Sequence, residues 1–220
     1  MSMPSRLQSR RPRLVLALGV VGAALGLLLV VNVMYVKIGE ATGTDLPKAE
    51  FALTLPRTLL GGRYELAQDD SGLVGRKMEE ADARDPAVEV TRALLARYSL
   101  HGDRTKGALV LSGFYGRIGN PDRVSAAALR SDGRAAGATV AVPPEDVTPS
   151  GSDVKVSCEI LTRKPAASTV ITYPVCSWTD GNTSAVVSQM AFGTTDPDLD
   201  LDSAARTTLE VRSEIRKAIR

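Results

Sequence analysis

The sequence predicts an α+β fold, with helices packed on one face of an antiparallel sheet, behind a single N-terminal transmembrane helix. The sheet is indicated by alternating apolar residues in successive segments between residues 154 and 192. A C-terminal helix is indicated by apolar residues at helical spacing, and the membrane helix by the uncharged segment Leu14–Val36. Because helices and strands do not alternate strictly along the chain, the pattern favours α+β over a parallel α/β fold.

The apolar segment sets the domain organisation. Its 23 residues carry no charge, and as a helix they would extend about 35 Å, enough to cross a bilayer core. Four arginines precede it, which predicts a cytoplasmic N-terminus and an extracytoplasmic C-terminal domain. The segment is too long for a cleaved signal peptide and no small-x-small cleavage site follows it, so we expect an uncleaved anchor in the cell membrane. The predicted parts are a basic cytoplasmic tail (1–13), a transmembrane helix (14–36), a stalk (37–56) and an extracytoplasmic domain (57–220).

Two glycines within the anchor suggest a contact between membrane helices. Gly22 and Gly26 form a G-x-x-x-G pattern, which lets two helices approach closely. This motif predicts a homodimer through the membrane helix. The alternative is that the glycines reflect only the ordinary glycine content of membrane helices.

The first half of the domain mixes predicted elements. Asp85-Pro86 and Asn120-Pro121 each combine an N-cap residue with a proline suited to the first helical position. We expect an amphipathic helix over 86–99, a buried strand over 108–114 and a second helix over 120–133. Gly113, near the end of that strand, and Gly116, before the second helix, could admit a ligand close to the backbone or simply serve a turn.

The second half predicts a meander of three strands and a final helix. The strands cover 154–160, 170–178 and 184–192, and the helix covers 201–218. Asp180-Gly181-Asn182 marks a tight turn. The turn could contain two or three residues, and each choice places the opposite face of the third strand inward, so the register after Asp180 stays open.

The two cysteines predict a structural disulfide. Cys158 lies on the inward face of the first of these strands, and a hairpin centred near Ala167 would place Cys176 opposite it. An extracytoplasmic compartment is oxidising, which favours a disulfide over free thiols. Trp178 would lie on the same face opposite Val156, either as a core residue or as a stacking platform for a ligand.

Several function classes lack support in the sequence. Of the 27 basic residues, four precede the anchor, which leaves 23 against 25 acidic residues beyond it and no basic footprint for nucleic acid. Two cysteines and the single, distant His101 are too few for a metal site. No nucleotide-binding motif is present, and Ser112 lacks the nucleophile elbow of a serine hydrolase. We therefore expect no cofactor, no metal and no catalytic residue that sequence can identify.

Cys158 and the element Cys176-Ser-Trp178-Thr-Asp180, followed by a valine-rich strand and an Arg/Glu-rich final helix, carry a resemblance. They resemble a group of uncharacterised actinobacterial extracytoplasmic proteins, single-pass or lipid-anchored, that share a Cys…Cys-x-Trp-Ala-Asp element. This chain has Thr179 where that pattern has Ala. The resemblance covers about residues 100–220, implies a location and a disulfide-bonded domain, and implies no activity.

The sequence therefore favours a non-enzymatic binding or interaction module at the cell envelope, anchored by one membrane helix. Its partner would be another envelope protein, a peptide or a small ligand. One alternative is an enzyme acting on cell-wall or lipid substrates, with a deep pocket near Trp178 or His101 that is lined by acidic residues. A second alternative is a structural subunit of a membrane complex.

Overall fold

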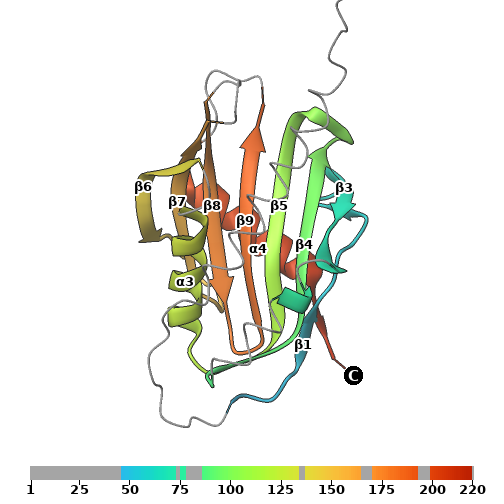
Figure 1. Cartoon of the computed structure of the whole chain (residues 1–220), viewed down its shortest axis with the longest axis vertical. Coiled ribbons are helices and arrows are strands. Elements are labelled where there is room, and N and C mark those ends of the chain that lie inside the picture. Colours follow the sequence, from blue (N-terminus) through green and yellow to red (C-terminus); the bar gives the residue numbers. More distant parts are fainter. Residues whose placement is uncertain are drawn as a thin grey trace, which may run out of the picture.

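The computed structural model describes residues 46–72, 75–77, 86–133, 137–164, 170–192 and 199–219. Strands account for 52% and helices for 21% of the structure. Eight antiparallel strands form one sheet in the order β2-β3-β4-β5-β9-β8-β7-β6, and β1 pairs with β10 separately (Figure 1). The α+β prediction is therefore wrong, because the domain is mostly β and is organised around one large antiparallel sheet.

The elements follow one another as a succession of strands interrupted by helices. The strands of the first half are β1 (Phe51–Leu53), β2 (Thr58–Leu59), β3 (Tyr64–Asp69), β4 (Val88–Leu100) and β5 (Asp103–Ile118). Those of the second half are β6 (Ala138–Asp146), β7 (Val156–Arg163), β8 (Ile171–Thr179), β9 (Thr183–Ala191) and β10 (Arg216–Ala218). The two long helices are α3 (Pro121–Gly133) and α4 (Leu201–Ile215).

The largest error of the sequence reading is at β4, which we expected to be a helix over 86–99. The strand is interrupted by a register shift between Val90 and Arg92 against β5, so its apolar alternation changes phase there. From Ala93 to Ala96 every residue is buried, because both faces of the strand are covered. The change of phase leaves three residues between successive inward positions, and the buried run after it is continuous. Both features also occur in an amphipathic helix, so the sequence wrongly predicted a helix here.

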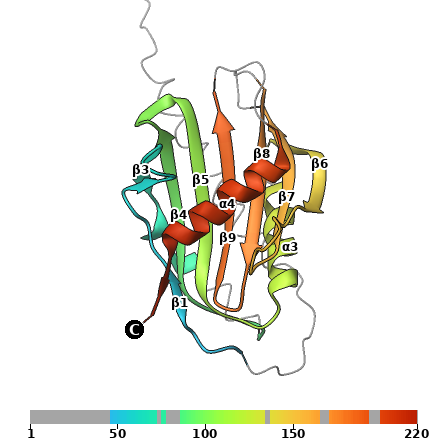
Figure 2. The same cartoon turned by 180° about the vertical axis from the view of Figure 1, so that it is seen from behind.

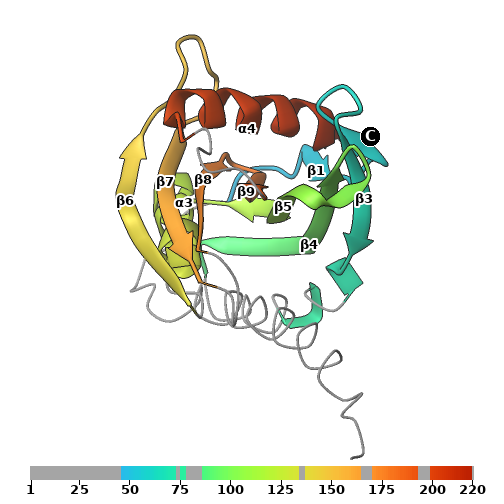
Figure 3. The same cartoon turned by 90° about the horizontal axis from the view of Figure 1, so that it is seen from above.

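The two long helices lie on opposite faces of the sheet rather than together on one face. In Figure 2, α4 crosses one face diagonally, and the view from above in Figure 3 shows the sheet curved around it. Leu129 of α3 packs with Tyr173 and Val175 on the other face. The middle strand of the meander, β8, is therefore covered on both faces, and seven of its consecutive residues are buried, from Tyr173 to Thr179.

The predicted hairpin between the cysteines is confirmed. Cys158 lies directly opposite Cys176 in the β7–β8 pair, and the two form a disulfide across a sequence separation of 18. Val156 lies opposite Trp178, as the centre near Ala167 predicts. The disulfide faces α4, where Ala204 and its neighbours pack over it.

The turn after β8 contains two residues, which settles the open register. Asp180 donates its N–H to the carbonyl of Thr183 at 2.9 Å, so Gly181 and Asn182 form the loop. The Asp180 carboxylate accepts the N–H groups of both Asn182 and Thr183, at 2.9 and 2.7 Å. Ala185 and Val187 are consequently opposite Trp178 and Cys176, on the face that meets α4.

A largely buried ion-pair network fastens α4 to this turn. Arg212, whose side chain is only 10% exposed, contacts Asp153 at 2.8 Å and Asp180 at 2.9 Å. Burial by itself raises the pKa of the Asp180 carboxyl, but hydrogen bonds from Arg212 and from the backbone of Asn182 and Thr183 together lower that pKa below its ordinary value. The carboxylate thus remains charged and holds the helix and the turn together.

The chain enters the domain beside the same turn. The amide of Asn182 donates to the carbonyl of Lys48 at 2.8 Å and accepts the N–H of Glu50 at 3.0 Å. Arg117 donates to the carbonyls of Leu46 and Pro47, and β1 then pairs with β10. The predicted stalk over 37–56 overlaps this docked segment, so from residue 46 onward it is part of the folded domain.

The predicted tail (1–13), membrane helix (14–36) and Gly22/Gly26 contact lie outside the described residues. Within the described ranges, none of the helices combines the length and the apolar character that crossing a membrane requires.

Removing the disulfide should destabilise the domain substantially. For the double variant Cys158→Ala/Cys176→Ala we expect the free energy of unfolding to fall by about 3 kcal/mol, because a loop of this length is released in the unfolded chain. Urea denaturation of the full chain measures this, and the reduced wild type serves as the matched control. Equal stability of the oxidised and reduced wild type would contradict the prediction.

The buried charge of Asp180 should contribute stability that depends on pH. Asp180→Asn keeps an oxygen for the turn but loses the ion pairs, so we expect a loss of about 3 kcal/mol at neutral pH. Because the folded pKa lies below the unfolded value near 3.9, the contribution is present above that value and is lost as pH falls through the folded pKa. The difference between wild type and variant should shrink below about pH 4.

The exposed pair of Asp146 with Lys155 provides the control for this measurement. Asp146→Asn should cost at most about 1 kcal/mol, because an exposed ion pair is screened by water. A loss of similar size for both variants would show that the Asp180 network has no special role.

Candidate functional site

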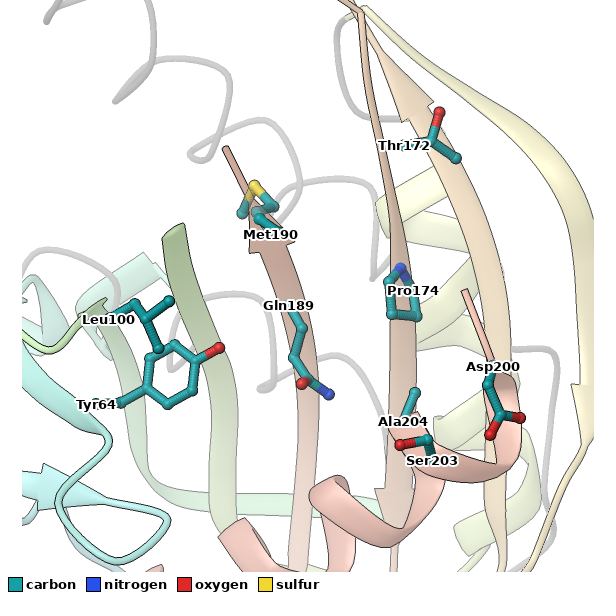
Figure 4. A pocket seen from close by; sticks show the side chains of 10 residues that line it. Tyr64, Leu100, Thr172, Pro174, Gln189, Met190, Asp200, Ser203 and Ala204 are labelled. Atoms are coloured by element: carbon teal, nitrogen blue, oxygen red, sulfur yellow. The ribbon is translucent and has the colours of Figure 1, made fainter. Parts of the chain in front are cut away.

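A pocket of about 140 Å³ opens on the concave face of the sheet, next to the first turn of α4 (Figure 4). One wall is formed by Tyr64 and Leu100, at the adjoining ends of β3 and β4. The opposite wall is formed by Ser203 and Ala204 of α4. Between the walls lie residues of β8 and β9, namely Thr172, Pro174, Gln189, Met190 and Ala191.

The pocket exists because α4 crosses the sheet diagonally and leaves part of it uncovered. On β9 the concave face carries Ala185 and Val187 under the helix, and the next residue on that face is Gln189. On β8 the concave face carries Cys176 under the helix, and the next residue on that face towards the pocket is Pro174. Beyond the start of α4 at Leu201 these strands continue, and none of the helices in the described residues covers them there. The small side chains of the first helical turn leave the remaining space open.

Several polar groups that line this space are free to bind a ligand. The Gln189 amide, the Tyr64 hydroxyl and the Ser203 hydroxyl make no hydrogen bond with any described residue. Figure 4 shows the Tyr64 hydroxyl directed towards the strand that carries Gln189. Thr172 shares a hydrogen bond of 3.3 Å with Thr162. Unpartnered amide and hydroxyl groups around a partly apolar space are typical of a small-molecule site.

The electrostatics of the pocket are simple. Burial raises the pKa of the Tyr64 phenol, with Arg63 acting weakly in the opposite direction, so the hydroxyl stays protonated and can donate a hydrogen bond at neutral pH. Among the described lining residues, Asp200 is the one with a formal charge. Its carboxylate caps α4 by accepting the N–H of Asp202 at 3.0 Å, and Arg206 lies 3.7 Å from it.

The predicted candidate residues lie elsewhere. Trp178 is fully buried, at 0% exposure, and its indole N–H donates to the Thr183 hydroxyl at 3.3 Å, so neither ring face is open to a ligand. Cys158 and Cys176 are joined and buried beneath α4. His101 is exposed in the β4–β5 turn, where its φ is 49°.

The glycines singled out in the sequence serve packing between strands. A Cβ at Gly113 would lie 2.5 Å from the carbonyl oxygen of Ser184, and one at Gly116 would collide with the carbonyl of Glu89. Both glycines belong to β5, so the close approach they permit is that of the neighbouring strands β9 and β4.

Sequence reasoning missed the pocket, although one signal was present. Gln189 interrupts an otherwise apolar alternation on β9, which would mark it as a polar residue on an inward face. That inference needed the register after Asp180, which the sequence left open. Tyr64 and Ser203 join Gln189 only through the tertiary fold. Within the described parts of the chain, no group of His, Cys, Asp and Glu side chains is arranged to hold a metal ion.

No protein-family model, curated protein or solved structure matches this chain. The resemblance to actinobacterial extracytoplasmic proteins therefore stays a prediction, whose most specific residues are the two cysteines, Trp178 and Asp180. In this chain the roles of those four residues are structural, as the disulfide, a core side chain and the anchor of α4.

The burial of Trp178 can be checked directly, because it is the single tryptophan of the chain. We expect its fluorescence in the native protein to be almost insensitive to acrylamide, since the quencher needs contact with the ring and the ring is enclosed. Urea-unfolded protein is the control and should be quenched strongly. Efficient quenching of the native protein would mean that the ring is accessible and would restore the stacking-platform interpretation.

Proposed function

We propose that the protein is a single-pass membrane protein whose extracytoplasmic domain is a non-enzymatic binding module at the cell envelope. The observation that carries the binding role is the pocket at the start of α4, where Gln189, Tyr64 and Ser203 present free polar groups. The apolar segment 14–36 and its arginine flank support the location. The disulfide supports an oxidising compartment.

The enzyme alternative expected a pocket near Trp178 or His101 lined by acidic residues. The pocket at α4 contains neither of these residues, and its one acidic residue, Asp200, already caps the helix. The geometry presents hydrogen-bonding groups without a nucleophile paired to a base. Recognition of a small ligand is therefore the better supported function.

A cysteine introduced at the pocket tests both the location and the binding role. The wild type has no free thiol, since both cysteines are bonded. In intact cells, a membrane-impermeant maleimide should label Ser203→Cys, because the domain lies outside the membrane. Ser5→Cys, in the predicted cytoplasmic tail, should be labelled only after the membrane is permeabilised.

Binding is read from the labelling rate. Ser213→Cys is the matched control, because Ser213 is exposed on the same helix but lies about 15 Å further along it. If two thirds of the pockets are occupied by an envelope ligand, Ser203→Cys should react about threefold more slowly, relative to Ser213→Cys, in cells than as purified protein. An unchanged ratio would contradict binding at this pocket, and labelling only after permeabilisation would contradict the location.

A further inference from the structure

We propose that the pocket binds one uncharged, hydroxyl-bearing sugar ring and disfavours sugars that carry a carboxylate or phosphate. This inference rests on the proposed binding function and adds the chemical class of the ligand. It draws on the size of the pocket, the arrangement of its polar and apolar groups, and its charge.

The size of the pocket fits a single six-membered ring. Its volume is about 140 Å³, and an engineered protein cavity of about 150 Å³ accommodates benzene. A longer chain or a two-ring ligand would have to extend into solvent. The open side of the pocket leaves room for such an extension, so the ring could be the end of a larger glycan.

The lining has the two-sided character that a sugar ring requires. Leu100, Pro174 and Met190 offer apolar surface, against which the C–H faces of a sugar can pack. Gln189 and the hydroxyls of Tyr64 and Ser203 offer both donors and acceptors. Each hydroxyl of a sugar is also both donor and acceptor, so these groups can satisfy it from several directions. A purely apolar ring would instead leave them unpaired, which is unfavourable.

The charge of the pocket selects against anions. No Lys, Arg or His is among the described lining residues, and Asp200 contributes a carboxylate. Phosphate and carboxylate recognition in proteins relies on guanidinium or ammonium groups. The described lining contains none, and the nearby Arg206 is already paired with Asp200. Because the Asp200 side chain is 54% exposed, water screens its effect, and the discrimination should amount to a few fold rather than orders of magnitude.

Saturation-transfer NMR on the full chain can measure these preferences. The protein is held in a phosphocholine detergent, since maltoside or glucoside detergents carry the proposed ligand. The probes are methyl glucoside, glucuronate, glucosamine and cyclohexanol. We expect methyl glucoside to bind with a Kd in the low millimolar range, as ordinary ligand efficiency implies for one ring. Glucosamine, whose ammonium group is attracted by the Asp200 carboxylate, should bind at least as tightly. Glucuronate should bind about fourfold more weakly than methyl glucoside.

Two variants connect the preferences to named residues. Gln189→Leu should reduce methyl glucoside binding about tenfold or more, because a buried hydroxyl would lose its partner. Asp200→Asn retains a capping side chain but removes the charge, so glucuronate should bind nearly as well as methyl glucoside. Asp202→Asn is the matched control: Asp202 lies in the same helical turn but outside the pocket lining, and this change should leave the ratio as in the wild type.

The outcomes separate this inference from the proposed function. If cyclohexanol bound and methyl glucoside did not, the inference that the ligand is a sugar would be overturned, although the pocket would still bind a ligand. The charge argument would be overturned if glucuronate bound more tightly than methyl glucoside. It would also be overturned if the Asp200 and Asp202 variants lost the preference for methyl glucoside over glucuronate to the same extent. If none of the probes binds, the sugar inference fails, whereas the proposed function is decided independently by the labelling ratio in cells.

Discussion

The ion pair between Asp180 and Arg212 is the interaction on which the rest of this domain depends. It joins the turn between β8 and β9 to the C-terminal half of α4. The other half of α4 rests on the disulfide through Ala204 and Ala205. The helix is thus held at two separated points, and these fix its diagonal course across the sheet. The pocket is the space that this course leaves open, so a structural network at the other end of the sheet determines where the pocket lies.

The sequence predicted those parts of the fold where one face of a strand alternates without interruption. From Val156 to Ile160 apolar and other residues alternate regularly, and this sufficed to place Cys158 opposite Cys176. It failed at β4, where a bulge changes the phase and both faces are buried, so that spacing no longer distinguishes strand from helix. The pocket could not be predicted because Gln189 faces inward only once the turn at Asp180 is known to contain two residues.

The residues that looked most distinctive in the sequence are structural, and the pocket is built from ordinary ones. The end of β8 and the turn after it contain Cys176, Trp178 and Asp180. These residues supply a disulfide, a buried ring and a buried charge, and each of these roles needs a specific side chain. A site of the kind we propose, for a single weakly bound ring, needs only polar groups left unpaired at the edge of the core. Such groups, like the Gln189 amide, have no spacing signature, since their neighbours come from distant segments.

The position of the pocket relative to the point where the chain enters the domain indicates from which side a ligand would reach it. If the segment 14–36 is the membrane anchor that we propose, nine residues separate it from Leu46, a reach of about 30 Å at most. The entry segment contacts the β8–β9 turn, where Pro47 lies against Gly181. From Thr183 at this turn, β9 runs six residues to Gln189, about 20 Å away. In the proposed anchored arrangement, the turn would lie nearer the membrane and the pocket nearer the far end of the sheet. That orientation suits a ligand presented from the envelope outside the bilayer better than a lipid within it.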